Sequence, residues 1–384
     1  MDNIVAALEH NDRICHLRLE DVIPSLQPEG ILAAIQKPFP SLTDLHLVFV
    51  CTPAPPALPI SFLGGSAPLL KSLRFSGIPF PELPKLLLSS THLVHLQLSY
   101  IPHSGYISPE TMATCISELS RLESLYIGFE SPRSRPDLKT RRQHPLTRIL
   151  LPVLTELRFR GVSGYFEDFV ARIDAPLLYN LAITFFHQLI FDTPQLTQFI
   201  SRIPKFKAHD EARVLFSNAW GVSVTLPQTS NGALRLGISC KQSDWQLSSL
   251  VQVCGSFFPW DLIPMVDHLY ILKHEFFQLR WQDDIESGQW LELLHPFTAV
   301  KNLYISQEFM PLISPVLQEL VGERATEVLP SLQTLFFEEP LPTGHVQEAI
   351  AQFLASRHLS GHPVAFSSWE RIKFNQWDIF GPCP

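Results

Sequence analysis

One short motif recurs along almost the whole of this 384-residue chain. The pattern is LxxLxL or a close variant, as in SLTDLHL (41–47), VLTELRF (153–159) and SLQTLFF (331–337). Twelve copies follow one another at spacings of 22 to 34 residues, each marked by its central apolar residue. These central residues are Leu17, Leu45, Leu73, Leu96, Leu125, Leu157, Leu181, Val214, Leu236, Leu269, Leu303 and Leu335. Such a period means that the chain is built from similar units, none of which can bury its apolar residues alone.

The motif and its period are those of a leucine-rich repeat. Alternation along a strand sends Leu45 and Leu47 inward, as it does Leu303 and Ile305. The stretches between strands, such as SPETMATCISELS (108–120), have helical periodicity. The sequence therefore predicts an α/β leucine-rich-repeat solenoid, or horseshoe, of about 12 units. Its parallel sheet would form the concave face, and short helices and 3₁₀ turns would form the convex face.

We expect one domain to span the whole chain, 1–384, with three departures from regularity. A basic loop is inserted at 131–144. The repeats at 205–245 fit worst, and their strand-like runs indicate either an irregular unit or a β-hairpin. The segment 340–384 closes the stack, and HPVAFSSW (362–369) is expected to add a last strand.

The composition agrees with this repeat pattern: the chain has 57 Leu and 33 Pro but only 17 Gly. Proline lacks an N–H and has a fixed φ, so it can end one unit and start the next strand. Six prolines lie five residues before a central apolar residue: Pro40, Pro68, Pro152, Pro176, Pro264 and Pro330. The prolines therefore support the repeat register independently.

The same composition excludes several classes of function. Glycine is scarce and no phosphate-binding glycine loop occurs, which argues against nucleotide enzymes. The net charge of −8 argues against a protein that coats nucleic acid. Six scattered cysteines without a CxxC pair are typical of a reducing compartment, and we find neither a signal peptide nor a membrane helix. We therefore expect a cytoplasmic or nuclear protein that does not bind membranes.

Several repeats also resemble those of F-box/leucine-rich-repeat-like proteins of mushroom-forming fungi. Four segments carry the resemblance: KPFPSLTDLHL (37–47), SFLGGSAPLLKSLRFSGIPFPELPKLLLSSTHLVHLQL (61–98), WLELLHPFTAVKNLYIS (290–306) and LVGERATEVLPSLQTLFF (320–337). In that family an F-box precedes the repeats and docks to a Skp1-type adaptor of a ubiquitin ligase. Here the first strand, ICHLRL (14–19), begins too early for an F-box to precede it. The resemblance therefore implies a Skp1-type partner only if an F-box exists upstream, and no adaptor-docking residue carries over.

Searches for catalytic and metal-binding motifs give weak candidates. Ser66, in GGSAP (64–68), has glycine neighbours like a nucleophilic serine, but it reads as a loop between units. His92 and His95 have metal-like spacing, yet an odd separation on a strand directs two side chains to opposite faces. Neither pattern predicts a site.

Acidic and thiol groups give no better candidates. Asp283 and Asp284 could form an acid/base pair, but an exposed acidic loop is the simpler interpretation. Cys240 and Cys254 could pair only in an oxidising compartment and read as small buried apolar residues. We therefore predict no catalytic residue, no metal and no cofactor.

One charge cluster occurs within the predicted loop insertion. Its basic residues are Arg133, Arg135, Lys139, Arg141, Arg142 and His144. It could contact phosphate or an acidic partner, although a solvated insertion is the simpler interpretation.

The concave face is the better candidate for function. The residue after each central position should point out of the sheet, and it is polar or cationic in early units but aromatic in late ones. These residues are Arg18, His46, Arg74, Gln97, Tyr126, Arg158, Ala182, Tyr270, Tyr304 and Phe336. Exposed Tyr and Arg are enriched in binding hot spots. We therefore predict a non-enzymatic scaffold that recognises an unknown protein partner; the alternatives are a ligase substrate receptor and an enzyme on a repeat scaffold.

Overall fold

A computed structural model describes most of the chain. The described residues are 2–20, 31, 33–49, 57–132, 147–188, 190–207, 209–217, 221–227, 232–240, 243–257, 265–274, 287–320, 324, 326–339 and 343–370. The chain falls into two compact units. Unit 1 comprises Met1–Lys207 and Gln228–Ser239, and unit 2 comprises Ala208–Pro227 and Cys240–Pro384. The prediction of one domain over 1–384 stays a prediction.

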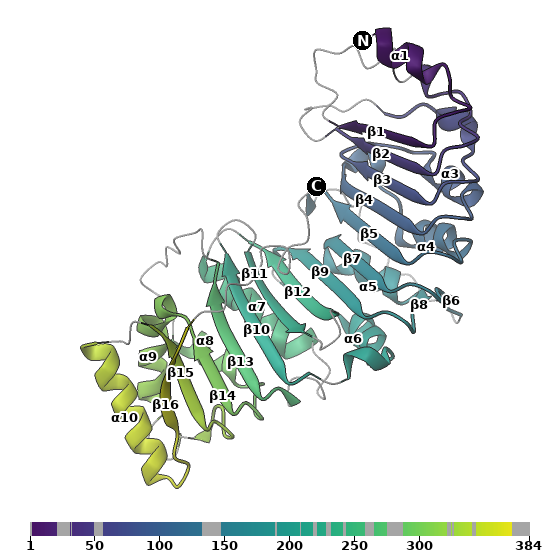
Figure 1. Cartoon of the computed structure of the whole chain (residues 1–384). Helices are drawn as coiled ribbons and strands as arrows, with labels where there is room; N and C mark the ends of the chain where they lie inside the picture. Colours follow the sequence, from purple (N-terminus) through teal and green to yellow (C-terminus); the bar gives the residue numbers. More distant parts are fainter. Residues whose placement is uncertain are drawn as a thin grey trace. The chain divides into compact units, whose positions relative to one another are not determined.

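Unit 1 contains a sheet whose neighbouring strands are all parallel, in the order β1-β2-β3-β4-β5-β7-β9-β12 (Figure 1). These strands are β1 (His16–Glu20), β2 (Asp44–Val48), β3 (Ser72–Ser76), β4 (His95–Ile101), β5 (Ser124–Phe129), β7 (Glu156–Gly161), β9 (Asn180–Phe186) and β12 (Ala233–Ser239). A separate parallel pair consists of β6 (Ile149–Leu150) and β8 (Ile173–Asp174).

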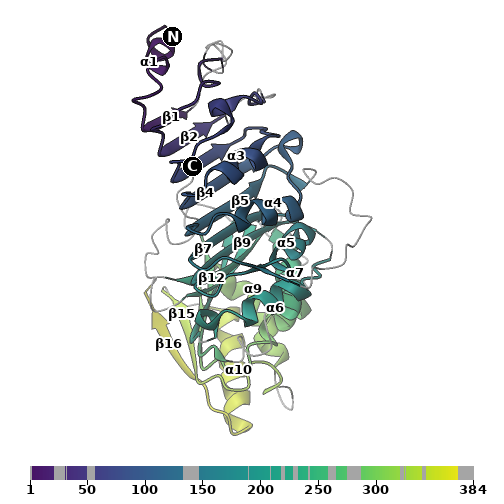
Figure 2. The same ribbon diagram turned by 90° about the vertical axis from the view of Figure 1, so that its right-hand side faces the viewer.

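Short helices connect the strands of unit 1 and cover one face of its sheet (Figure 2). The connecting helices are η1 (Phe62–Gly65), α3 (Leu83–Ser89), η2 (His103–Gly105), α4 (Pro109–Ser117), α5 (Ser163–Val170), α6 (Pro194–Ser201) and η4 (Pro204–Phe206), where η denotes a 3₁₀ helix. Another helix, α1 (Asp2–Leu8), precedes β1. The other face of the sheet in each unit, which none of the described helices covers, is called the open face below.

Unit 2 continues the pattern after a hairpin. β10 (Glu211–Ser217) pairs antiparallel with β11 (Gly221–Pro227) and parallel with β13 (His268–Lys273). Parallel pairing then runs through β14 (Asn302–Ile305), β15 (Thr334–Glu338) and β16 (Ala365–Trp369). The helices are α7 (Ser243–Phe257), α8 (Ser287–Leu294), η6 (Gln307–Phe309), α9 (Met310–Glu319) and α10 (His345–Leu359).

The predicted register places the leucines in rows. Leu17 pairs with Leu45, Leu45 with Leu73, and the row continues through every strand of the unit 1 sheet to Leu234. These side chains are buried against the helices. Each contributes roughly 1.5–3 kcal/mol by leaving water, but only because the next unit covers it. The predicted α/β leucine-rich-repeat solenoid is confirmed.

The prolines lie in tight turns at the ends of the units. The N–H of Leu42 donates to the carbonyl of Phe39, so Pro40 is the second residue of a β-turn, where its fixed φ fits. Equivalent turns contain four more of the six prolines: Ala67–Leu70, Leu151–Leu154, Ala175–Leu178 and Leu329–Leu332. Pro264 lies outside the described residues.

One carbonyl per unit then joins it to the next. The carbonyl of Cys15 accepts the N–H groups of both Thr43 and Asp44, and that of Thr43 accepts those of Lys71 and Ser72. The same pair of hydrogen bonds is repeated from β4 to β9 in unit 1 and from β13 to β15 in unit 2. These bonds keep each strand in register where the ladder begins.

Three expectations about irregular segments have clear outcomes. The repeats at 205–245 contain the β-hairpin β10–β11, and the expected closing strand is β16. The choice of Val214 and Leu236 as central residues is wrong, because Ala212 pairs with Leu269 and Leu234 with Leu181. The error is two residues, which keeps the same side chains buried and so leaves no trace in the apolar pattern.

None of the described helices combines the length and the apolar character needed to cross a membrane.

Candidate binding surface on the open faces

The residues predicted for the concave face of unit 1 lie side by side in one row. Arg18 pairs with His46, His46 with Arg74, and Arg74 with Gln97; Tyr126, Arg158 and Ala182 follow in the same register. Arg235 on β12 extends this row and was missed. Sequence reasoning overlooked it because it centred that repeat on Leu236. Centring it on Leu234 would have identified Arg235.

The N-terminal end of this row has internally balanced charges. An Arg18 Nη2 lies 2.5 Å from Glu20 Oε1, and His46 Nδ1 lies 3.6 Å from the same oxygen. The guanidinium of Arg18 holds the pKa of Glu20 below its usual value. Partial burial lowers the pKa of His46, although the Glu20 carboxylate opposes this effect.

The corresponding row in unit 2 is an aromatic ladder, formed by Tyr270, Tyr304 and Phe336. The three residues pair in register on β13, β14 and β15. Their rings are nearly parallel, with centroids 4.2 Å apart for Tyr270 and Tyr304 and 4.4 Å apart for Tyr304 and Phe336. All three side chains are partly buried. The three aromatic residues predicted for the late units therefore form a contiguous ordered stack.

A tryptophan at the closing strand supports the ladder and was missed by sequence reasoning. The Trp369 ring stands nearly perpendicular to Tyr270 and Tyr304, with centroids 6.2 and 5.8 Å away. It packs with Leu215 and Leu272 in a small cluster on the open face. Trp369 is only 9% exposed, and its position depends on how β16 joins the sheet. The signal for it was the predicted strand at 362–369.

The surroundings of Tyr270 favour its uncharged phenol. Burial raises the pKa of Tyr270, and the negative charge of Glu211 and the neighbouring Tyr304 act in the same direction. Tyr270 therefore stays protonated in any physiological condition. The ladder offers ring edges and phenolic hydroxyls, which suit contact with an apolar or mixed protein surface.

The middle of the unit 1 row combines arginines with aromatic rings. Arg158 lies 3.8 Å from the Glu156 carboxylate. The Arg160 guanidinium lies between two rings, 5.5 Å from the centroids of both Tyr100 and Phe186.

The weak catalytic and metal candidates gain nothing from the structure. Ser66 follows a tight loop in which Gly64 has φ +65° and an added Cβ would meet Pro38 at 3.1 Å. His92 and His95 are exposed, and the described residues contain no group of three His, Cys, Asp or Glu that could hold a metal. The tight loop before Ser66 explains the neighbouring glycines, so this serine needs no catalytic role to account for them.

The remaining candidates are buried or undescribed. Cys240 and Cys254 are buried, neither forms a disulfide with another described cysteine, and burial raises the pKa of Cys254 to about 12. Such a thiol is unreactive at neutral pH. Asp283 and Asp284 lie outside the described residues, as do the basic residues of the 131–144 segment, Arg133, Arg135, Lys139, Arg141, Arg142 and His144.

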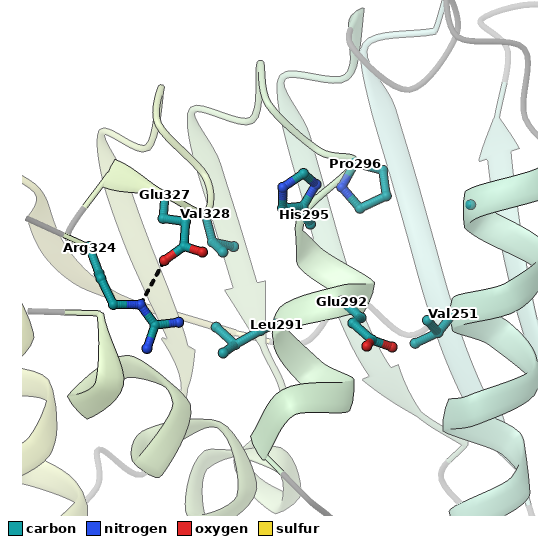
Figure 3. A pocket seen from close by; sticks show the side chains of 9 residues that line it. Val251, Leu291, Glu292, His295, Pro296, Arg324, Glu327 and Val328 are labelled. Carbon is teal, nitrogen blue, oxygen red and sulfur yellow. Dashed lines mark hydrogen bonds and ion pairs between the residues drawn. The ribbon is translucent and has the colours of Figure 1, made fainter.

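A pocket of about 410 Å³ lies on unit 2 beside α7 and α8 (Figure 3). Its lining includes Glu292, His295, Arg324 and Glu327. Arg324 Nε lies 2.7 Å from the Glu327 carboxylate, so these two charges satisfy each other. No hydrogen bond links His295 to either glutamate in the part of the chain that the structure describes, and Figure 3 shows Glu292 and His295 apart.

Comparisons with known proteins assign this chain to no family. No protein-family model and no curated protein sequence matches it. Among solved structures, it is similar to the leucine-rich repeat-containing protein LegL7 from Legionella pneumophila. That similarity has 12% sequence identity and a TM-score of 0.35, and it covers 90% of this chain and 98% of LegL7. A superposition this loose carries no argument, so the fold rests on the strand order and register described above.

Proposed function

We propose that this protein is a non-enzymatic scaffold that recognises another protein through the open faces of its repeat strands. The partner would pack against side chains that vary from unit to unit while the buried leucines hold the strands in place. No bond chemistry is required, because recognition follows from burial and complementarity alone.

The observation that carries this proposal is the aromatic ladder. Aromatic side chains with a polar tip lose little conformational entropy on binding and dominate binding energy at interfaces. Tyr270, Tyr304 and Phe336 are already stacked with one another and supported by Trp369. A partner that contacts the ladder therefore meets a preordered surface and gains affinity from that order.

Affinity purification tests the proposal directly. The tagged protein and its double variant Tyr304→Ala, Phe336→Ala would be used to capture binding proteins from a lysate of the source organism, with identification by mass spectrometry. We expect a partner held by the parent protein to be reduced at least tenfold by the double variant. The matched control is Trp245→Ala, which removes a 50%-exposed aromatic residue from α7 and should leave capture unchanged.

Two outcomes would count against the ladder. Equal capture by the parent and the double variant would remove these residues from the binding surface. Loss of capture with Trp245→Ala alone would move the surface to the helices. Circular dichroism of each variant shows whether lost capture reflects lost folding.

A narrower proposal makes the chain the substrate receptor of an SCF-type ubiquitin ligase. Its support is the resemblance of the repeats at 37–47, 61–98, 290–306 and 320–337 to F-box/leucine-rich-repeat-like proteins. Co-purification of a Skp1-type adaptor with the full-length gene product would support this role, and capture of partners without any adaptor would contradict it.

A further inference from the structure

Three arginines surround a part of the unit 1 open face where the side chains are small. Arg158 on β7 and Arg235 on β12 pair with opposite sides of Ala182 on β9. Arg160 occupies the same relation to Thr184, whose other partner is Gly237. Because neighbouring strands lie about 4.8 Å apart, the Cα atoms of Arg158 and Arg235 are about 10 Å apart. Long side chains from these positions can reach one shared group above Ala182.

Arg160 is the fixed member of this arginine cluster. Its guanidinium lies 5.5 Å from the ring centroids of Tyr100 and Phe186, and the side chain is partly buried. The described residues provide no hydrogen bond or ion pair to it. Cation–π contact with two rings restrains the side chain, and the described residues take up none of its N–H groups in hydrogen bonds. Such a cation is preorganised to donate to an anion.

The backbone around Arg160 is shaped to allow this stacking. Tyr100 has φ +49°, in the left-handed region that non-glycine residues rarely adopt, where β4 and β5 shift register. On the intervening strand, Gly128 pairs with Arg160, and the Tyr126 ring lies where a Cβ of residue 128 would be. The missing Cβ leaves room for the Tyr126 ring on β5, the strand that lies between those of Tyr100 and Arg160. A strained residue held against a cation is the kind of feature found at functional sites.

Charge balance favours an acidic ligand. Among the open-face positions of β5, β7, β9 and β12, the single acidic residue that the structure describes is Glu156, near Arg158. The three arginines and this one carboxylate are the charged residues among those described positions, in a chain whose net charge is −8. Burial and the nearby charge of Arg158 lower the pKa of Arg235 to about 10. An anion bound here would relieve this repulsion.

We propose that Arg158, Arg160 and Arg235 form an anion-binding site for an acidic peptide segment of the partner protein. The segment would place a carboxylate or a phosphate group above Ala182 and Thr184, where it accepts charge-assisted hydrogen bonds from the arginines. An extended segment suits the exposed strand face better than a free ion, because its neighbouring side chains can contact Tyr126. This inference rests on the proposed recognition function but concerns a different unit from the aromatic ladder.

Fluorescence anisotropy with defined peptides tests the site. The probes are three labelled octapeptides of Gly with Glu, with phosphoserine, or with Gln at the same alternating positions, and unlabelled pyrophosphate serves as a competitor. We expect at least one acidic peptide to bind, the Gln peptide to bind at least tenfold more weakly, and binding to weaken with salt. Arg160→Gln and Arg235→Gln should each weaken acidic binding at least tenfold, whereas Arg160→Lys should restore part of it.

The control for charge alone is Arg121→Gln, an exposed arginine outside the arginine cluster. Equal affinity in Arg160→Gln and the parent, an equal loss in Arg121→Gln, or no binding of either acidic peptide would overturn the site. Displacement by pyrophosphate at concentrations below the peptide's Kd would overturn the choice of a peptide ligand. The ladder variant Tyr304→Ala, Phe336→Ala should bind the acidic peptides normally, so the two proposals fail separately.

Discussion

At the residue scale, the buried leucines carry the fold and the residues between them carry recognition. Leu157 and Leu303 show no exposed surface, whereas Arg158 and Tyr304, their immediate neighbours, reach the open face. Successive residues of a strand point to opposite faces. A substitution at one position therefore affects stability, and a substitution at the next position affects binding.

Replacing Leu157 or Leu303 by Ala should lower the free energy of unfolding by about 2–5 kcal/mol, because each leaves a cavity in a packed interior. Urea denaturation followed by circular dichroism measures the loss. Leu177→Ala, at a position that is 54% exposed, is the control and should change stability by less than about 0.5 kcal/mol. A loss below that value at Leu157 would show that the proposed register is wrong.

The sequence predicted some open-face residues and missed others for a physical reason. Tyr270, Tyr304 and Phe336 are predictable because each follows a central residue at a fixed offset. Trp369 and Arg160 act through contacts with other strands, set by the closing strand β16 and by the irregularity at Tyr100. The repeat motif predicts which residues share a row across the strands, but not the contacts that side chains make outside their own row.

At the element scale, neighbouring repeats are joined by a carboxylate at a helix start. Glu167, on α5, is buried, and its two carboxylate oxygens accept the N–H groups of Gln195 (2.8 Å) and Leu196 (2.9 Å) in the first turn of α6. These N–H groups have no partner within the helix, so one repeat caps the helix of the next. The pattern of leucines does not predict this contact, since it joins residues 28 and 29 positions apart.

Glu167 should also make stability depend on pH. Burial raises its pKa from 4.5 to about 7, against the opposing effect of the two N–H donors. A carboxyl whose pKa is higher in the folded state stabilises the fold below its unfolded pKa and loses that contribution as pH rises through the folded value. We therefore expect the stability of the parent, relative to Glu167→Gln, to fall by on the order of 1–3 kcal/mol between pH 4.5 and 7.

Urea denaturation across this pH range provides the measurement, with exposed Glu118→Gln as the control. If the relative stability of the parent instead rises with pH, the backbone N–H groups dominate and Glu167 is ionised in the folded protein.

At the scale of the whole molecule, both units are built from the same type of repeat. All twelve central residues inferred from the sequence lie in strands, and each unit repeats the same carbonyl link between successive strands. The hairpin β10–β11 departs from this repeat because its strands are antiparallel. Only three residues, 218–220, separate its strands, and a parallel crossover needs many more. The pairing of β12 with β9, and of β10 with β13, depends on contacts distant in sequence and could not be predicted from spacing.

The central claim is that partners bind the open face, and site-specific photocrosslinking tests it most directly. A photoreactive phenylalanine analogue would replace Tyr304 on the aromatic ladder or, as the control, Trp245 on α7, and the protein would be irradiated in a lysate of the source organism. We predict one reproducible crosslinked partner from position 304 and none from position 245. Crosslinks from position 245 without any from position 304 would contradict the account.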